Sequence, residues 1–106
     1  MLKPVFVTHE GALMPVDILD IVCLRVDNNY TRMYLSNKTH CIVCLSLTGV
    51  LKRLPDDIFI RTSRTYAVSV YFIERIEKTT VIVAGEPIPI ARDKYGSVLE
   101  KLVVLR

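Results

Sequence analysis

The sequence contains only three cysteines, Cys23, Cys41 and Cys44. An odd number without a framework spacing argues against a disulfide-stapled secreted domain. The first residues, MLKP, lack a charged start followed by a long apolar run, so no signal peptide is predicted. No apolar stretch approaches the roughly 20 residues that a membrane span needs. We therefore expect a cytoplasmic protein that does not bind a membrane.

Signatures of catalysis and of metal binding are also lacking. The sequence has no glycine-rich phosphate loop, nucleophile elbow or HExxH motif. Neither Ser63 nor Ser69 has a nearby histidine in sequence to activate it. Cys41 and Cys44 lie three apart in a predicted strand, so they point to opposite faces, and no second ligand pair follows. We expect no enzyme, metal or cofactor, and we interpret the cysteines as small buried hydrophobes.

The composition is that of a globular protein with a modest core. Hydrophobic residues make up 51% of the 106 residues and charged residues 24%. The net charge is +3 and the pI is near 8.9. This mildly basic balance permits a polyanionic partner without requiring one.

Hydrophobic periodicity predicts a mainly β protein. Alternation of period two indicates strands at 5–8, 12–16, 21–26, 30–36, 40–45, 58–62, 67–70, 73–78, 80–84 and 88–90. Turn signals lie at 10–11, 27–29, 37–38 and 85–87. An amphipathic helix capped by Ser46 is expected at 47–54, because its apolar residues fall at i, i+3, i+4 and i+7. A last helix is expected from about 92 to 102, where Gly96 weakens its regularity.

Arg61 and Arg64 form the most informative basic segment, because no acidic residue occurs anywhere from Ile58 to Ile73. One interpretation is a strand with solvated arginines on its outer face. The other is a turn that presents Arg64 to nucleic acid, where arginine pairs bidentately with guanine. The hydroxyls of Thr62, Ser63 and Thr65 could then donate to phosphates.

Two further segments likewise have both a purely structural interpretation and a nucleic-acid-binding one. Arg92 and Lys94 stand at the start of the predicted last helix, where a docked phosphate would offset their unfavourable position against the helix dipole. The alternative is that Asp93 satisfies that dipole. Asp27 to Arg32 is either an ordinary hairpin turn or a loop that places Asn28, Asn29, Tyr30 and Arg32 in a groove.

The order of these pieces resembles the LytTR DNA-binding domain, the output module of many bacterial response regulators, over about residues 6–102. The most specific piece is FIRTSRTYAVS at 59–69, where the family pattern is close to F-x-R-x-H-R-S-x-x-V-N. The hairpin at 20–30, the helix that ends in Leu-Pro, and the segments 73–76 and 88–92 occur around it in family order.

The resemblance implies an elongated, mainly antiparallel β fold of LytTR type, with one short internal helix and one C-terminal helix. It also implies a single domain over residues 1–106, with a core of about 6–102. In the family, loops from one side of the domain enter successive major grooves of double-stranded DNA. The family's base-contacting positions correspond to Arg64 and Arg92, and its first DNA-contacting loop to Asn28, Asn29 and Tyr30. Arg61 and Lys94 are assigned to the DNA backbone by charge and proximity.

The implied function is sequence-specific binding of double-stranded DNA, as the output domain of a bacterial transcriptional regulator of the two-component response regulator type. Promoter direct repeats are the expected target, with a homodimer on DNA as an arrangement to test. Family members usually follow a receiver domain, which this sequence does not contain, so the chain is either part of a longer regulator or a stand-alone domain.

The sequence departs from the family pattern at several positions. The family histidine is Ser63 here, the usual serine is Thr65, the terminal asparagine is Ser69, and the serine before the last arginine is Ala91. Ser63 and Thr65 keep hydrogen-bonding capacity, whereas Ala91 loses a helix cap. These changes motivate an alternative: a protein-interaction or sensory module on the same scaffold, with weak or lost DNA binding.

Overall fold

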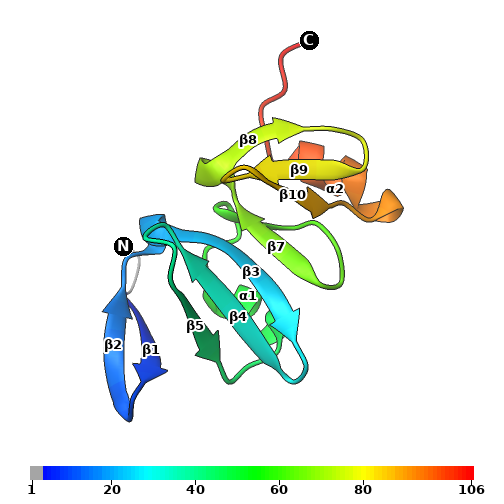
Figure 1. The fold of residues 1–106 in the computed structure, drawn as a ribbon. Coiled ribbons are helices and arrows are strands. Elements are labelled where there is room, and N and C mark those ends of the chain that lie inside the picture. The colour runs from blue at the N-terminus through cyan, green and yellow to red at the C-terminus, as the bar shows by residue number, and fades with distance from the viewer. Residues whose placement is uncertain (1–3) are drawn as a thin grey trace.

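The computed structural model describes residues 4–106, which fold into three antiparallel sheets and short helical segments (Figure 1). The strands, in chain order, are β1 (Val5–His9), β2 (Ala12–Val16), β3 (Ile21–Asp27), β4 (Tyr30–Leu35), β5 (His40–Val43), β6 (Phe59–Arg61), β7 (Tyr66–Ser69), β8 (Ile73–Ile76), β9 (Thr80–Val83) and β10 (Glu86–Pro89). The helical segments are η1 (Ile18–Asp20), α1 (Leu47–Arg53), η2 (Val70–Phe72), η3 (Arg92–Lys94) and α2 (Tyr95–Glu100).

The central sheet has the strand order β5-β4-β3-β7-β6, and it separates two hydrophobic clusters. On one face, Leu24, Met33 and Phe59 pack with Leu47 and other residues of α1, which lies behind the sheet in Figure 1. On the other face the three-stranded sheet β10-β9-β8 and α2 form the second cluster. Burial on both faces explains why the first four residues of β3 form an unbroken buried hydrophobic run.

The second cluster places the C-terminal sheet and α2 against strands β3, β6 and β7. Its buried members include Cys23, Ile60, Val68, Val81 and Val98. Burial raises the pKa of the Cys23 thiol to about 11, against a smaller lowering by the nearby charge of Arg25. The molecule measures 47 × 31 × 25 Å along its principal axes and is built of antiparallel sheets, which confirms the expected elongated, mainly antiparallel β fold.

Several local predictions are confirmed at the level of single atoms. The Ser46 hydroxyl caps α1 by accepting from the Gly49 amide at 3.1 Å. Asn28 adopts a φ of 56°, the left-handed conformation that asparagine tolerates in a turn. Ala91 offers no side-chain cap to the helical segment that follows it.

Two predicted elements need correction. The turn expected at 85–87 lies instead at Ala84 and Gly85, and Pro87 belongs to β10, which tolerates it because β10 is an edge strand. The single helix expected at 92–102 is divided into η3 and the short α2, which ends at Glu100. The missing cap at Ala91 and the low helix propensity of Gly96 account for the short, irregular helix.

Candidate nucleic-acid interface

The β6–β7 loop, residues 62–65, is a tight loop held by its own hydrogen bonds. The hydroxyl oxygen of Ser63 accepts from the backbone amides of Thr65 and Tyr66, both at 3.1 Å. The amide of Thr62 donates to the Tyr66 carbonyl at 3.0 Å. The side chain of Arg64 is exposed, so a rigid loop presents this arginine to solvent.

Arg61 supports the loop from the end of β6. Its Nε donates to the Ser63 carbonyl at 3.0 Å and its Nη2 to the Arg64 carbonyl at 2.8 Å. Its Nη1 donates to the hydroxyl oxygen of Thr48 in α1 at 2.8 Å. The guanidinium thus connects α1 to the backbone on either side of the exposed arginine. Its contact with DNA stays a prediction, and these bonds give it a separate internal role.

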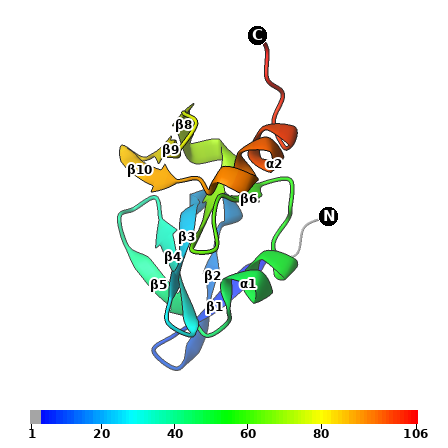
Figure 2. The same ribbon diagram turned by 90° about the vertical axis from the view of Figure 1, so that its right-hand side faces the viewer.

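Two long-range backbone hydrogen bonds bring the predicted segments together. The Ala91 amide donates to the Thr62 carbonyl at 2.8 Å, which places the segment with Arg92 beside the β6–β7 loop. The Val26 amide donates to the Thr65 carbonyl at 2.8 Å, which joins the loop to the end of β3, just before the β3–β4 turn. All three segments therefore belong to one side of the molecule, on the right in Figure 1 and facing the viewer in Figure 2.

The β3–β4 turn carries the first group of predicted contacts. Asn28, Asn29 and Tyr30 are exposed at its tip. Arg32 is different, because its Nη2 lies 2.6 Å from Oδ2 of Asp27. The Tyr34 hydroxyl and the Asp27 carboxylate raise the pKa of Arg32 above its usual range. The turn thus offers amide and phenol groups outward, whereas Arg32 already has a partner within the hairpin.

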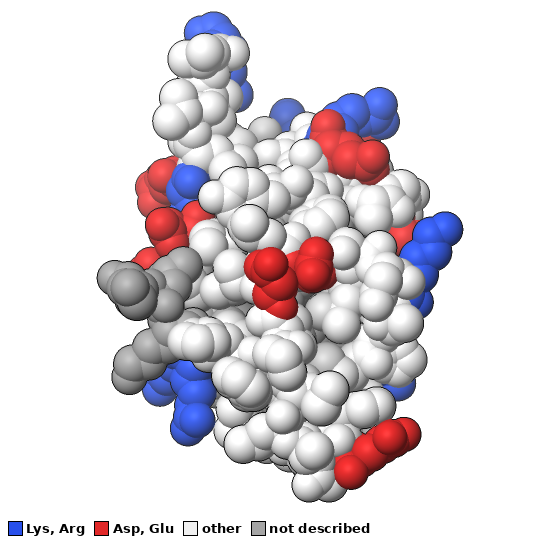
Figure 3. Space-filling model, turned by 90° about the vertical axis from the view of Figure 1, so that its left-hand side faces the viewer, with Lys and Arg blue, Asp and Glu red and all other residues white. Residues whose placement is uncertain are grey.

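Apart from Arg32, the basic residues predicted to contact DNA on this side have no acidic partner within the described part of the chain. Among residues 4–106, none of the ion pairs within 4.0 Å involves Arg64, Arg92 or Lys94. Arg92 is exposed and Lys94 half-buried in the turn of η3. The opposite side of the molecule has acidic side chains near its centre and broad uncharged areas, with basic groups toward the edges (Figure 3). A polyanion would therefore find uncompensated arginines on the side of the three segments.

Sequence patterns do not indicate two tertiary contacts of the fold, one at the end of α2 and the other at the β6–β7 loop. Thr48 reaches it from α1 through Arg61. Lys101 follows α2, and its Nζ donates to the backbone carbonyl of Asp56 at 3.0 Å. Both contacts depend on tertiary packing between segments that are distant in sequence, so neither periodicity nor motif spacing could have identified them.

The described residues contain no group of three or more His, Cys, Asp or Glu side chains that could hold a metal. Cys41 is half-buried and Cys44 exposed, so the interpretation of the cysteines as buried hydrophobes is wrong for Cys44 and holds for Cys23. Within residues 4–106, no helix has both the length and the apolar character needed to cross a membrane.

Comparison with known proteins identifies relatives of this arrangement. The family model described as the LytTr DNA-binding domain matches residues 11–103. A solved LytTr DNA-binding domain from Bacillus cereus, described as part of a methyl-accepting/DNA response regulator, superimposes with a TM-score of 0.79 at 21% sequence identity. The match covers 92% of this chain and 94% of that one, and at this identity it shows a shared fold. No curated protein is significantly similar to the chain.

Proposed function

Because the chain belongs to the LytTr DNA-binding domain family, we propose that it binds double-stranded DNA in a sequence-specific manner as the output domain of a bacterial transcriptional regulator in the cytoplasm. The proposal takes residues 1–106 as one such domain, with a core of about 6–102. It assigns base contacts to Arg64 and Arg92, and further contacts to the exposed β3–β4 turn.

One observation carries the proposal: the hydrogen bond from Ala91 to Thr62 sets Arg92 beside the loop of Arg64. Both arginines are exposed and lack acidic partners within the described chain. A guanidinium that approaches a guanine edge from a rigid support pairs bidentately with O6 and N7. Two such groups on adjoining segments provide the specific contacts that phosphate neutralisation alone lacks.

The test is the titration of genomic fragments, first enriched by selection on the purified protein, against random duplex of equal length by fluorescence anisotropy. We expect enriched fragments to bind at least tenfold more tightly than random duplex, and to share a sequence element. With six to ten phosphate contacts, affinity would fall by roughly 10³–10⁵ between 50 and 200 mM salt. If no fragment is preferred at any salt concentration, the proposal of specific regulation fails.

The regulatory context is a further part of the proposal. A homodimer on direct repeats would give two footprints of equal size. Inserting half a turn of DNA between the two repeats should then change the affinity. Weak, salt-insensitive DNA binding together with a stable complex with a protein would instead favour an interaction module.

A further inference from the structure

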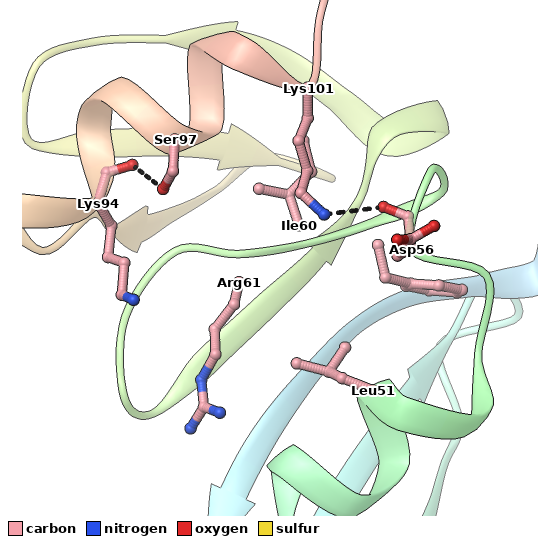
Figure 4. A pocket seen from close by; sticks show the side chains of 8 residues that line it. Leu51, Asp56, Ile60, Arg61, Lys94, Ser97 and Lys101 are labelled. Atoms are coloured by element: carbon pink, nitrogen blue, oxygen red, sulfur yellow. Dashed lines mark hydrogen bonds between the residues drawn. The ribbon is translucent and has the colours of Figure 1, made fainter.

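A cleft of about 240 Å³ lies next to the β6–β7 loop, between α1 and the C-terminal helical segment (Figure 4). Its walls come from four parts of the chain: α1, the connection to β6, β6 itself, and the segment from η3 to Lys101, directly after α2. The polar and charged residues among its lining are Asp56, Arg61, Lys94, Ser97 and Lys101.

The cleft has an excess of positive charge. Three cations, Arg61, Lys94 and Lys101, line it with one carboxylate, Asp56, so the sum of three positive charges and one negative charge is +2. Lys101 donates to the backbone carbonyl of Asp56, and no ion pair within 4.0 Å among the described residues joins its ammonium to a carboxylate. Like charges that line one cleft repel one another, and an anion bound there would reduce that repulsion.

The cationic groups are supported by the backbone around them. The Ser97 hydroxyl donates to the Lys94 carbonyl at 2.9 Å, and the Lys94 amide donates to the Ala91 carbonyl at 2.8 Å. Arg61 is fixed by its bonds to Thr48 and to the β6–β7 loop. Figure 4 shows the Lys94 side chain extending toward the side of Arg61, and Lys101 toward Asp56. An anion could therefore enter without rearrangement of the backbone.

The cleft adjoins the residues that the proposed function assigns to DNA. Arg61 lines the cleft and also donates to the carbonyl of Arg64, while Lys94 lies two residues after Arg92. A duplex that docks on Arg64 and Arg92 would bring its own phosphates to the edge of the cleft. We propose that the cleft binds one backbone phosphate of the DNA through Lys94 and Lys101, with Arg61 adding its charge from the floor. This inference rests on the proposed function and extends the DNA contact to α2.

The test uses Lys94→Gln, Lys101→Gln and the double variant, each measured by anisotropy on enriched and random duplex at several salt concentrations. The loss of one phosphate contact decreases the steepness of the negative slope of log K against log [salt] by about 0.9. We expect that decrease for the double variant on both duplexes, with the ratio of specific to random affinity unchanged. The matched control is Lys38→Asn, since Lys38 has a φ of 68° in the β4–β5 turn, at the other end of β4 from the β3–β4 turn. It should keep the wild-type slope.

The outcomes separate this inference from the proposed function. A double variant that folds, by circular dichroism, and keeps the wild-type salt slope overturns the cleft assignment while specific binding by the wild type stands. A wild type without sequence preference defeats the proposed function, and the slope on random duplex still decides the cleft. A double variant that loses specificity but keeps its slope also overturns the cleft assignment.

A second measurement distinguishes DNA from a free anion. Amide shifts of Ser97 and Lys101 in the labelled wild-type protein would be followed during titration with duplex, and separately with inorganic phosphate at constant ionic strength. We expect the duplex to move both amides and to displace any bound inorganic phosphate. Saturable binding of inorganic phosphate that the duplex does not displace would overturn the proposal.

Discussion

Thr48 in α1 accepts a hydrogen bond of 2.8 Å from Nη1 of Arg61, 13 residues further along the chain. The same guanidinium donates to the carbonyls of Ser63 and Arg64, so a helix on one face of the central sheet is connected to the exposed loop. A basic residue expected to touch DNA thus has its donors directed into the protein. We expect the orientation of Arg64 to depend on this support, and the dependence can be measured.

Thr48→Val removes the hydroxyl without changing charge or side-chain shape. A hydrogen bond of this kind contributes about 0.5–1.5 kcal/mol, or more with a charged donor. We expect specific affinity to fall by up to about tenfold, with the salt slope unchanged, because no cation is lost. Anisotropy titrations would measure both quantities. Thr8→Val, at an exposed site in β1, is the control. Wild-type affinity in the Thr48 variant would show that the loop does not depend on α1.

Arg61→Lys keeps the positive charge but lacks the planar fork that reaches three acceptors. If Arg61 acts mainly by holding the loop, the variant should lose roughly tenfold or more on its specific site, and little on random duplex. Arg53→Lys, at an exposed position of α1, should have no effect. A full rescue by lysine, combined with equal losses on both duplexes in Arg61→Gln, would instead make Arg61 a phosphate contact.

Ser63 stands where the family has histidine, and its hydroxyl oxygen accepts from two backbone amides. Ser63→Ala should therefore lower the free energy of unfolding by about 1–2 kcal/mol, measured by urea denaturation. Ser63→Asn, whose side-chain oxygen can take over the role in a turn, should lose less. An alanine variant of wild-type stability that loses DNA affinity would mean that the hydroxyl contacts DNA rather than the loop.

The pH dependence of stability reports on the burial of Cys23 in the second hydrophobic cluster. Burial raises the pKa of its thiol from 9.0 to about 11, so the folded protein favours the neutral form. Its contribution to stability is complete below pH 9 and is lost as the pH rises toward 11. We expect the free energy of unfolding to fall over this interval, and to fall less in Cys23→Ala. Equal pH dependence of the two proteins would contradict burial of the thiol in the folded state.

Much of the fold was predictable because its causes are local. The apolar spacing of 47–54 and the hydroxyl of Ser46 specify α1. Asn28 marks its turn because asparagine tolerates a positive φ. The turn expected at 85–87 is wrong, because Glu86 and Pro87 belong to β10. The tolerance of Pro87 on the edge strand β10 depends on strand order, which the local sequence does not contain.

The candidate interface was predictable only in its residue types. The acid-free run around Arg64 and the basic residues before the last helix can be seen in the sequence, and the resemblance assigns base contacts to Arg64 and Arg92. Their proximity depends on the bond between Thr62 and Ala91, 29 residues apart, and thus on the packing of the C-terminal sheet. The pairing of Arg32 with Asp27 could not be predicted from the sequence either, because it depends on strand register and side-chain conformation.

Arg64→Ala should separate base reading from simple attraction to the DNA backbone. A bidentate contact with guanine is worth about 1–3 kcal/mol, so specific affinity should fall by about 5- to 150-fold. Selection on a randomised site should show relaxed preference at one base pair, and Arg92→Ala should relax a different one. Arg53→Ala is a control for general loss of charge. Equal losses on specific and random duplex, with all base preferences retained, would restrict Arg64 to a phosphate contact and leave specificity to the other segments.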